Sequence, residues 1–390
     1  MGVIEDLVNQ FKNCFGTEPD LVVRAPGRVD LIGTHTDYND GWVLPAAIDR
    51  YAWVAAKKLE SREIHIKALE FSTTCFSLEN LDSKTSTDGK QLEGWEVYAA
   101  GVARSLQEME VEVPGCQILI SSQVPIGVGL SSSAAVEVAY ATALTKLIPV
   151  EVDRMQLALA CQKAENSYVG VSSGLMDQFS SLFGQEGKAL AFDCRNRVWE
   201  PVPLSPKIKL VVADTCTKRT LTTSKYNERY SECQQAVQAL QSVLPGTKAL
   251  RDVSQEQFEQ HKELIPEPAR WRAKHVIDEI SRVQEASEAL KKGEIEALGN
   301  LMDASHQSSR DLFEASSFEL DAMWEASKDH PGRLGGRFVG AGWGGCTVFL
   351  VLTESAEDFC EYLSQRYEKA TGIKPQVFLL NAAEGANQVA

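Results

Sequence analysis

Charged and polar residues that could contact a ligand are concentrated in one stretch near the N-terminus, residues 24–45. Within it stand Arg28, Asp30, His35 and Asp37, between two apolar segments that we predict to be strands. Loops between strands commonly carry ligand-binding groups. A solvated hairpin in which Asp and Asn side chains only shape turns would have the same composition. Composition therefore leaves a ligand site and a plain hairpin both open.

A second stretch, residues 124–135, is rich in glycine and serine and reads Val-Pro-Ile-Gly-Val-Gly-Leu-Ser-Ser-Ser-Ala-Ala. It follows a predicted strand and opens a predicted helix. Gly127 and Gly129 would let the backbone approach an anion, and the first N–H groups of the helix would point at it. The stretch is not a Walker A loop, and Ser132 stands where a dinucleotide-binding motif has its third glycine. The pattern indicates a phosphate cradle, although a serine-capped helix after a glycine turn has the same spacing.

Two carboxylates and a third glycine-rich stretch complete the candidate residues. Glu165 lies in a predicted helix, where a lone Glu is ordinarily solvated, and Asp177 begins a further helix, where a carboxylate also favours the helix dipole. Residues 340–348 read Gly-Ala-Gly-Trp-Gly-Gly-Cys-Thr-Val between two predicted strands. Glycines in such a position most often form a tight or bulged connection.

The elements that must position these residues fall into blocks. In the first half we predict strands at 21–25, 42–56, 64–68 and 117–121. They are followed by helices at 131–147, 152–168 and 176–182 and by a strand at 189–192. In the second half we predict a strand at 208–213, helices at 222–243, 268–291, 294–309 and 318–327, strands at 337–340 and 346–352, a helix at 357–371 and a strand at 376–380. Segregation into blocks favours an α+β protein. Because 390 residues exceed the usual size of one core, we predict two domains, 1–205 and 206–390.

Composition excludes several classes of function. A net charge of −15 without a long Lys/Arg cluster argues against nucleic-acid binding, although local backbone amides can still bind an anion such as ATP. No apolar run approaches the ~20 residues of a membrane span. The N-terminus lacks the regions of a signal peptide, and the nine scattered cysteines contain no C-x-x-C pair that could start a zinc or redox site. We expect a cytoplasmic protein with reduced thiols, no membrane partner, and a monomeric or weakly dimeric state.

All three stretches resemble signature motifs of galactokinases, which belong to the GHMP family of small-molecule kinases. The order P-G-R-V-x-L-I-G-x-H-T-D-Y-N-x-G-x-V-L-P in the first, P-x-G-x-G-L-S-S-S-A in the second and the loop of the third are similar to that family's motifs in their correct order. The resemblance implies a two-domain GHMP kinase fold with the active cleft between the domains. It also implies phosphorylation of the anomeric hydroxyl of galactose by ATP.

Residue roles follow from the same resemblance. It places Arg28 beside the transferred phosphate and makes Asp177 the catalytic base. It implies sugar contacts for Thr34, His35, Asp37, Gly174 and Tyr226. Nucleotide contacts are implied for Gly127, Gly129, Ser131, Ser132 and Ser133, with Trp95 either lining the adenine pocket or packing in the core. Mg²⁺ would be held by Ser133, within the serine run, and by Glu165, because a hard dication bound to phosphates needs only one or two protein oxygens.

Two residues depart from the family pattern. Galactokinases usually read G-R-V-N-L-I-G-E-H, whereas this chain has Asp30 and Thr34 in place of Asn and Glu. The resemblance assigns the Glu to the C6 hydroxyl, so a kinase for a C6-altered sugar (galacturonate, arabinose or a deoxyhexose) is an alternative. A non-catalytic sensor of galactose and ATP is another alternative, but it fits poorly with a complete serine run and the presence of both Arg28 and Asp177.

Overall fold

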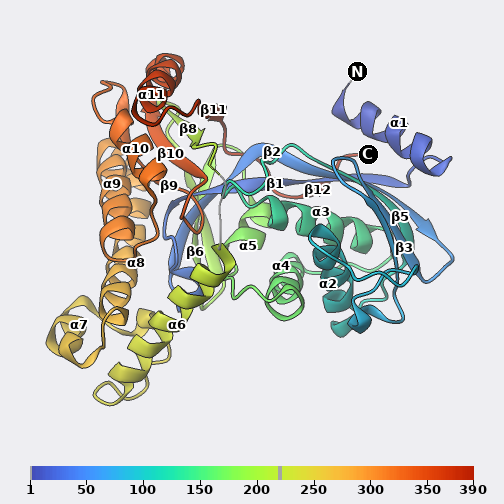
Figure 1. Ribbon diagram of the computed structural model, residues 1–390, viewed down its shortest axis with the longest axis horizontal. Coiled ribbons are helices and arrows are strands. Elements are labelled where there is room, and N and C mark those ends of the chain that lie inside the picture. Colours follow the sequence, from blue (N-terminus) through green and yellow to red (C-terminus); the bar gives the residue numbers. More distant parts are fainter. Residues whose placement is uncertain (1, 218–221) are drawn as a thin grey trace.

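The computed structural model describes residues 2–217 and 222–390, which form two sheets with helices packed on them (Figure 1). The larger sheet has the order β12-β1-β2-β5-β3-β4, with β6 pairing to β2 and β7 to β6. Its strands are β1 (Leu21–Ile32), β2 (Trp42–Leu59), β3 (Glu63–Ala68), β4 (Thr73–Ser77), β5 (Gly115–Ser122), β6 (Lys188–Asp193), β7 (Val198–Pro203) and β12 (Asn387–Gln388). The last strand therefore returns from the C-terminus to pair with β1.

Helices cover both faces of this sheet. One face carries α2 (Trp95–Glu108), α3 (Ser132–Lys146), α4 (Arg154–Lys163) and α5 (Met176–Phe183), and the other carries α1 (Val3–Phe15) (Figure 1). Helix α3 is apolar around most of its circumference and buried along its length, which is typical of a helix inside a core. Directly after α4, residues Ala164–Val169 form a π-helical turn.

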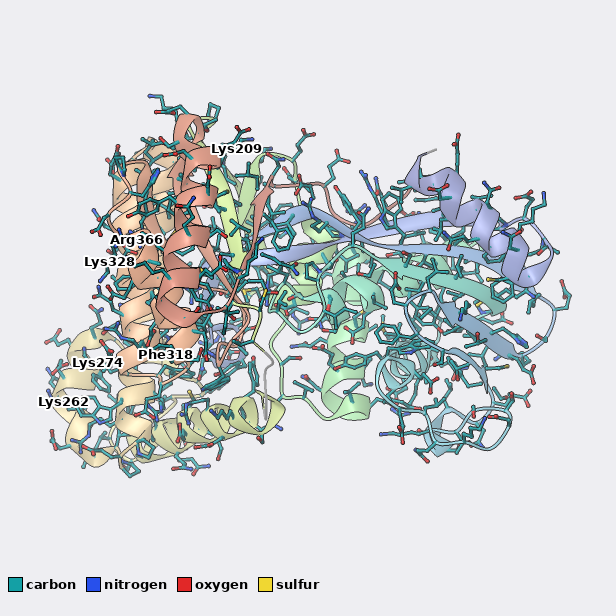
Figure 2. All side chains as sticks on the ribbon, turned by 45° about the horizontal axis from the view of Figure 1, so that its top comes forward. Lys209, Lys262, Lys274, Phe318, Lys328 and Arg366 are labelled. Carbon is teal, nitrogen blue, oxygen red and sulfur yellow. The ribbon has the colours of Figure 1, made fainter. Side chains whose placement is uncertain are left out.

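The smaller sheet has the order β11-β8-β10-β9, formed by β8 (Ile208–Asp214), β9 (Arg333–Phe338), β10 (Cys346–Leu352) and β11 (Gln376–Leu380). Alternate side chains pack on opposite faces: Val211 and Phe349 join a cluster with helices α10 (Phe318–Ser327) and α11 (Ala356–Thr371), while Leu210 and Val348 join the main core. The helices are α6 (Thr222–Gln241), α7 (Gln255–His261), α8 (Ala269–Lys292), α9 (Ile295–Asp311), α10 (Phe318–Ser327) and α11 (Ala356–Thr371). Exposed basic side chains such as Lys262 and Lys328 lie on their outer surface, together with the exposed Phe318 (Figure 2).

The α+β prediction is confirmed, with local corrections. Arg28 and Asp30 lie in strand β1, which continues to Ile32 and shifts register twice against β2, so they are not in a loop. Two helices, α1 and α2, precede the first predicted one, and β9 occupies 333–338, not 337–340. Strands β4, β7 and β12 and helix α7 were not predicted. None of the cysteines in the described part of the chain forms a disulfide bond, and no described helix has both the length and the apolar character that crossing a membrane requires.

Candidate active site

Arg28 and Asp177 form the centre of the candidate site. Nη2 and Nε of Arg28 lie 2.7 and 2.9 Å from Oδ1 of Asp177, while Nη1 donates to the carbonyl oxygen of Gly129 at 2.6 Å. The hydroxyl of Ser131 donates to the second oxygen, Oδ2, of Asp177. Burial, the largest single cause, would lower the pKa of Arg28, but the charges of Asp177, Asp30 and Asp37 and the hydrogen bond to Asp177 together outweigh it, so the pKa is raised. The guanidinium is therefore a fixed positive charge beside the Asp177 side chain.

The loop before α3 has the form of an anion cradle. Gly127 and Gly129 have positive φ angles of 76° and 94°, and Ser131 adopts the left-handed region at 57°, which is uncommon for a residue with a Cβ. Because the Ser131 hydroxyl bonds to Asp177, it does not cap α3. Ser131 thus gives the first amides of the helix no side-chain acceptor, which suits them to bind a phosphate.

Glu165 lies on the π-helical turn, a local structure that often marks functional positions. Its Oε2 accepts from Ser173 Oγ at 2.7 Å and from Gln178 Nε2 at 3.0 Å, while Ser133 Oγ is 3.4 Å from its Oε1. Mg²⁺ with oxygen ligands at about 2.1 Å requires neighbouring ligands roughly 3.0 Å apart. The donor set of Ser133 and Glu165 therefore fits this ion in chemistry and in spacing.

A second buried carboxyl group, Glu137, lies behind Glu165 and was missed by the sequence analysis. Gln178 Nε2 also donates to Glu137 Oε2, at 3.3 Å, so one amide bridges both side chains. Burial, followed by the neighbouring charge of Glu165, raises the pKa of Glu137 well above its ordinary value. Burial therefore favours the neutral form of Glu137. Its place among the Ala and Val residues in the middle of α3 was the available signal.

All five residues predicted to contact sugar line one cavity of about 160 Å³, together with Arg28 and Asp177. Within it, Asp37 lies against Gly174, where any side chain would overlap the Asp37 carboxylate. Burial, followed by the charge of Asp177, raises the pKa of Asp37 to about 7. This cavity-lining carboxyl group therefore releases its proton close to neutral pH and not near pH 4.

His35, in the connection between β1 and β2, contacts residues from the second half of the chain at this cavity. Its Nε2 donates to the carbonyl oxygen of Ala341 at 3.1 Å, so its Nδ1 accepts from the Tyr38 hydroxyl at 2.9 Å. The ring stacks on Phe313 with centroids 4.5 Å apart, and burial lowers the pKa of His35 to about 3. The imidazole is neutral, and a sugar hydroxyl that binds it must replace one of these two partners.

Thr34 and Asp30 form a buried group with Arg337. The Thr34 hydroxyl donates to Asp30 Oδ2, and Arg337 Nη1 lies 2.7 Å from that same oxygen. Gly340 N donates to Asp30 Oδ1 at 2.8 Å, which fixes the C-terminal glycine loop to β1. Both carboxylate oxygens of Asp30 thus accept hydrogen bonds from the protein. Thr34 lines the cavity, but its hydroxyl proton is already donated to Asp30. Arg337 gave no signal in the sequence because it is 307 positions from Asp30.

A larger cavity of about 730 Å³ adjoins the first. It is lined by every residue predicted to contact nucleotide, Trp95 included, and also by Phe71, Tyr98 and Ile126, which the sequence analysis missed. Phe71 and Ile126 are exposed apolar side chains, a feature that suits stacking against a flat base. The two cavities share Arg28, Asp177, Gly340 and Ala341.

Family models match the chain in three places along its length. The galactokinase galactose-binding signature matches residues 9–58, the GHMP kinases N terminal domain matches residues 97–185, and the GHMP kinases C terminal model matches residues 286–369. The first of these covers the stretch containing Arg28 and His35.

Individual proteins agree with these matches. A galactokinase of Roseiflexus sp. (strain RS-1) is 41% identical over 385 residues, covering 98% of this chain and 97% of that protein. One from Chloroflexus aggregans (strain MD-66 / DSM 9485) is 37% identical over 380 residues, covering 97% and 96%. The crystal structure of Lactococcus lactis galactokinase complexed with galactose matches at a TM-score of 0.94 and 32% identity, covering 100% of both chains. A mevalonate kinase structure, 18% identical, matches at a TM-score of 0.62 and covers 94% of this chain. The predicted two-domain GHMP kinase fold is confirmed.

Proposed function

This chain belongs to the galactokinase family of GHMP kinases, and we propose that Asp177 and Arg28 carry out its reaction, the ATP-dependent phosphorylation of galactose on the anomeric hydroxyl. The observation that carries the assignment is the junction of the two cavities. A sugar in the smaller cavity and ATP in the larger would meet where Arg28 and Asp177 line both. Phosphoryl transfer depends mainly on such positioning and on charge stabilisation.

In the proposed reaction the anomeric O–H of galactose donates its proton to Asp177. The anomeric oxygen then forms a bond to the γ-phosphorus as the bond from that phosphorus to the bridging oxygen of ADP breaks, which gives galactose 1-phosphate and ADP. Arg28 stabilises the negative charge that develops on the transferred group. The loop amides around Gly127 and Gly129 and the first amides of α3 hold the phosphates. Thr34, His35, Asp37, Gly174 and Tyr226 surround the sugar, and Trp95 borders the base.

We propose Mg²⁺ as the cofactor, held by Ser133 and Glu165, where it would neutralise phosphate charge. We also propose a domain boundary near residue 205, in the connection between β7 and β8. A cytoplasmic location and a monomeric or weakly dimeric state remain proposals from composition, and sedimentation velocity at several protein concentrations would check the second.

Thr34 bears most on which substituents the enzyme accepts at C6 of the sugar. The Thr34 side chain is small, its hydroxyl is bonded to Asp30, and it places no carboxylate against the sugar at that position. We therefore propose that C6-altered sugars such as 6-deoxygalactose or galacturonate are also accepted. Arg28, Asp177 and Ser131 are all present and in contact, which does not support the alternative of a non-catalytic sensor.

An ATP-coupled assay across galactose, galacturonate, arabinose, 6-deoxygalactose and N-acetylgalactosamine tests this function. We expect ADP release with galactose and a ³¹P spectrum that shows an anomeric phosphate ester. The absence of galactose-dependent ADP release would reject the proposal, and a higher kcat/KM for another sugar of the panel would replace galactose as the substrate.

A further inference from the structure

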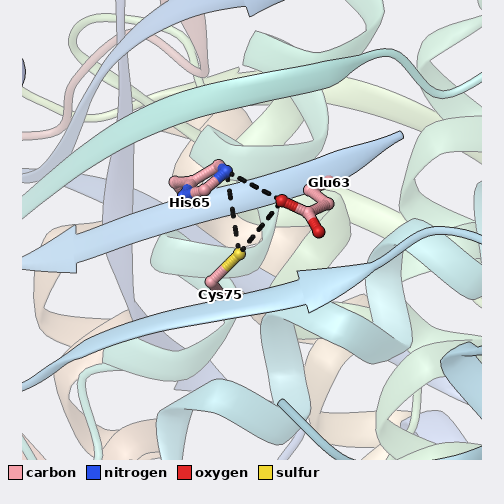
Figure 3. Close-up of side chains that lie close together, drawn as sticks. All are labelled: Glu63, His65 and Cys75. Atoms are coloured by element: carbon pink, nitrogen blue, oxygen red, sulfur yellow. Dashed lines mark hydrogen bonds and ion pairs between the residues drawn. The ribbon is translucent and has the colours of Figure 1, made fainter. Parts of the chain in front are cut away.

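Three side chains with metal-binding atoms lie together on the larger sheet (Figure 3), and none of them lines either cavity. Glu63 and His65 stand on β3 and Cys75 stands on β4. Nε2 of His65 is 3.3 Å from Oε2 of Glu63, and Sγ of Cys75 is 3.7 Å from the first atom and 3.9 Å from the second. One carboxylate oxygen, one imidazole nitrogen and one sulfur therefore converge on a single point.

The backbone places these atoms together. Glu63 and His65 are two positions apart on one strand and so share a face of the sheet, and Cys75 is the direct cross-strand neighbour of His65. The opposite face carries Ile64, Ile66 and Phe76, which are buried in the main core and fix the register. The loop after β4 adds a bond from Thr87 N to the Cys75 carbonyl oxygen at 2.8 Å, which fixes that strand from its outer side.

The triangle of donors has the dimensions of a zinc site. Zn²⁺ binds carboxylate oxygen and imidazole nitrogen at about 2.0–2.1 Å and thiolate sulfur at about 2.3 Å, so tetrahedral angles separate the ligand atoms by roughly 3.3–3.6 Å. The three separations in the chain, 3.3, 3.7 and 3.9 Å, need to change by only a few tenths of an ångström. A hard ion such as Mg²⁺ prefers oxygen ligands to sulfur and nitrogen.

We propose that Glu63, His65 and Cys75 bind one thiophilic divalent ion of the zinc class, with a fourth position open to water. The side chains of Glu63 and His65 are 44% and 40% exposed, so an ion can enter without rearrangement of the core. Sequence spacing alone gave no zinc motif, because the ligands come from two strands and not from a C-x-x-C pair. Nothing in the proposed kinase reaction uses these three residues.

Cobalt titration of the 390-residue chain tests the proposal, because Co²⁺ bound to a thiolate gives a charge-transfer absorption band. We expect one Co²⁺ per chain with that band, displacement by Zn²⁺, loss of the band in Cys75→Ser, and an affinity at least ~10-fold weaker in His65→Ala and Glu63→Gln. Cys14→Ser, which alters an exposed thiol elsewhere, should bind like the unaltered chain. No thiolate band in the unaltered chain, or the same band in Cys75→Ser, would overturn the site. Retained galactose phosphorylation verifies that each variant is folded.

Discussion

The guanidinium of Arg28 and the carboxylate of Asp177 form an ion pair 2.7 Å long at the junction of the two cavities. The same guanidinium donates to the Gly129 carbonyl of the anion cradle. Arg28 therefore links the proposed base to the loop that would hold phosphate, and a substitution there should act on transfer more than on substrate capture.

Replacing Arg28 by Ala should lower kcat by at least ~100-fold, because the charge that faces the transferred phosphate is lost. Arg28→Lys keeps the charge but not the fork that contacts Asp177 and Gly129 together, so it should lie between Ala and the unaltered enzyme. Steady-state kinetics and ATP titration separate the effects. If Arg28→Ala lowers the affinity for ATP as much as it lowers kcat, Arg28 acts in binding ATP in the ground state and not in the transfer step.

Glu165→Gln should raise the Mg²⁺ concentration for half-maximal activity by at least ~10-fold, because one charged ligand oxygen is lost. Glu137→Gln is the matched control, since burial favours the neutral form of Glu137, the same Gln178 contacts it, and an amide has nearly its shape. Its magnesium titration should resemble that of the unaltered enzyme. Equal shifts in both variants would show that the Glu165 effect comes from packing and not from ligation.

The pair of Asp30 and Thr34 calls for a double substitution. Thr34→Glu alone would place a second carboxylate beside Asp30, which already occupies Arg337. Asp30→Asn combined with Thr34→Glu moves the carboxylate to the position usual in galactokinases without creating that repulsion. One hydrogen bond involving a charged group contributes ~1.5–3 kcal/mol, so the preference for galactose over 6-deoxygalactose should increase by roughly 10- to 150-fold.

The readout for this double variant is the ratio of kcat/KM values for the two sugars, with Asp30→Asn alone as control. Galacturonate should lose activity in the double variant because a carboxylate would face its own. Unchanged ratios would show that position 34 does not contact C6.

Asp37 should make folding stability depend on pH. Its pKa is about 7 in the folded chain and about 3.9 in an unfolded one, so between these values the folded state holds a proton that the unfolded state has released. Stability from this group is therefore lost as the pH rises through that window. Asp37→Asn removes the effect. Urea titrations give the free energy of unfolding of the variant and of the unaltered chain at each pH. The variant's value minus that of the unaltered chain should rise from pH 4 to 7. A constant difference would contradict the shifted pKa.

Several elements could be predicted because local chemistry determines them. Strands β10 and β11 begin and end where the apolar runs predicted, at 346–352 and 376–380, since turn-forming residues bound each run. Helix α2 was missed because it contains Gly101 and has no side-chain cap, both unfavourable to an isolated helix. Its stability comes from packing, with the Gly101 backbone against the Tyr168 ring.

The candidate residues were found from the motifs and from the family resemblance, but the contacts among them were not. Pro26 and Gly27 interrupt the strand pattern, so Arg28 and Asp30 were expected in a loop, whereas β1 continues through them with two shifts of register. The ion pair of Asp30 with Arg337 joins opposite ends of the chain. No local pattern encodes such a contact, because only tertiary folding decides which charges meet.

The most direct test of the proposed reaction is the turnover of Asp177→Asn with galactose and saturating ATP, measured beside the unaltered enzyme. Asparagine has nearly the shape of Asp but cannot accept the proton of the anomeric hydroxyl, so kcat should fall by at least ~100-fold while ATP binding largely survives. If the variant keeps more than about half of the unaltered turnover, Asp177 is not the base and the proposed mechanism is wrong.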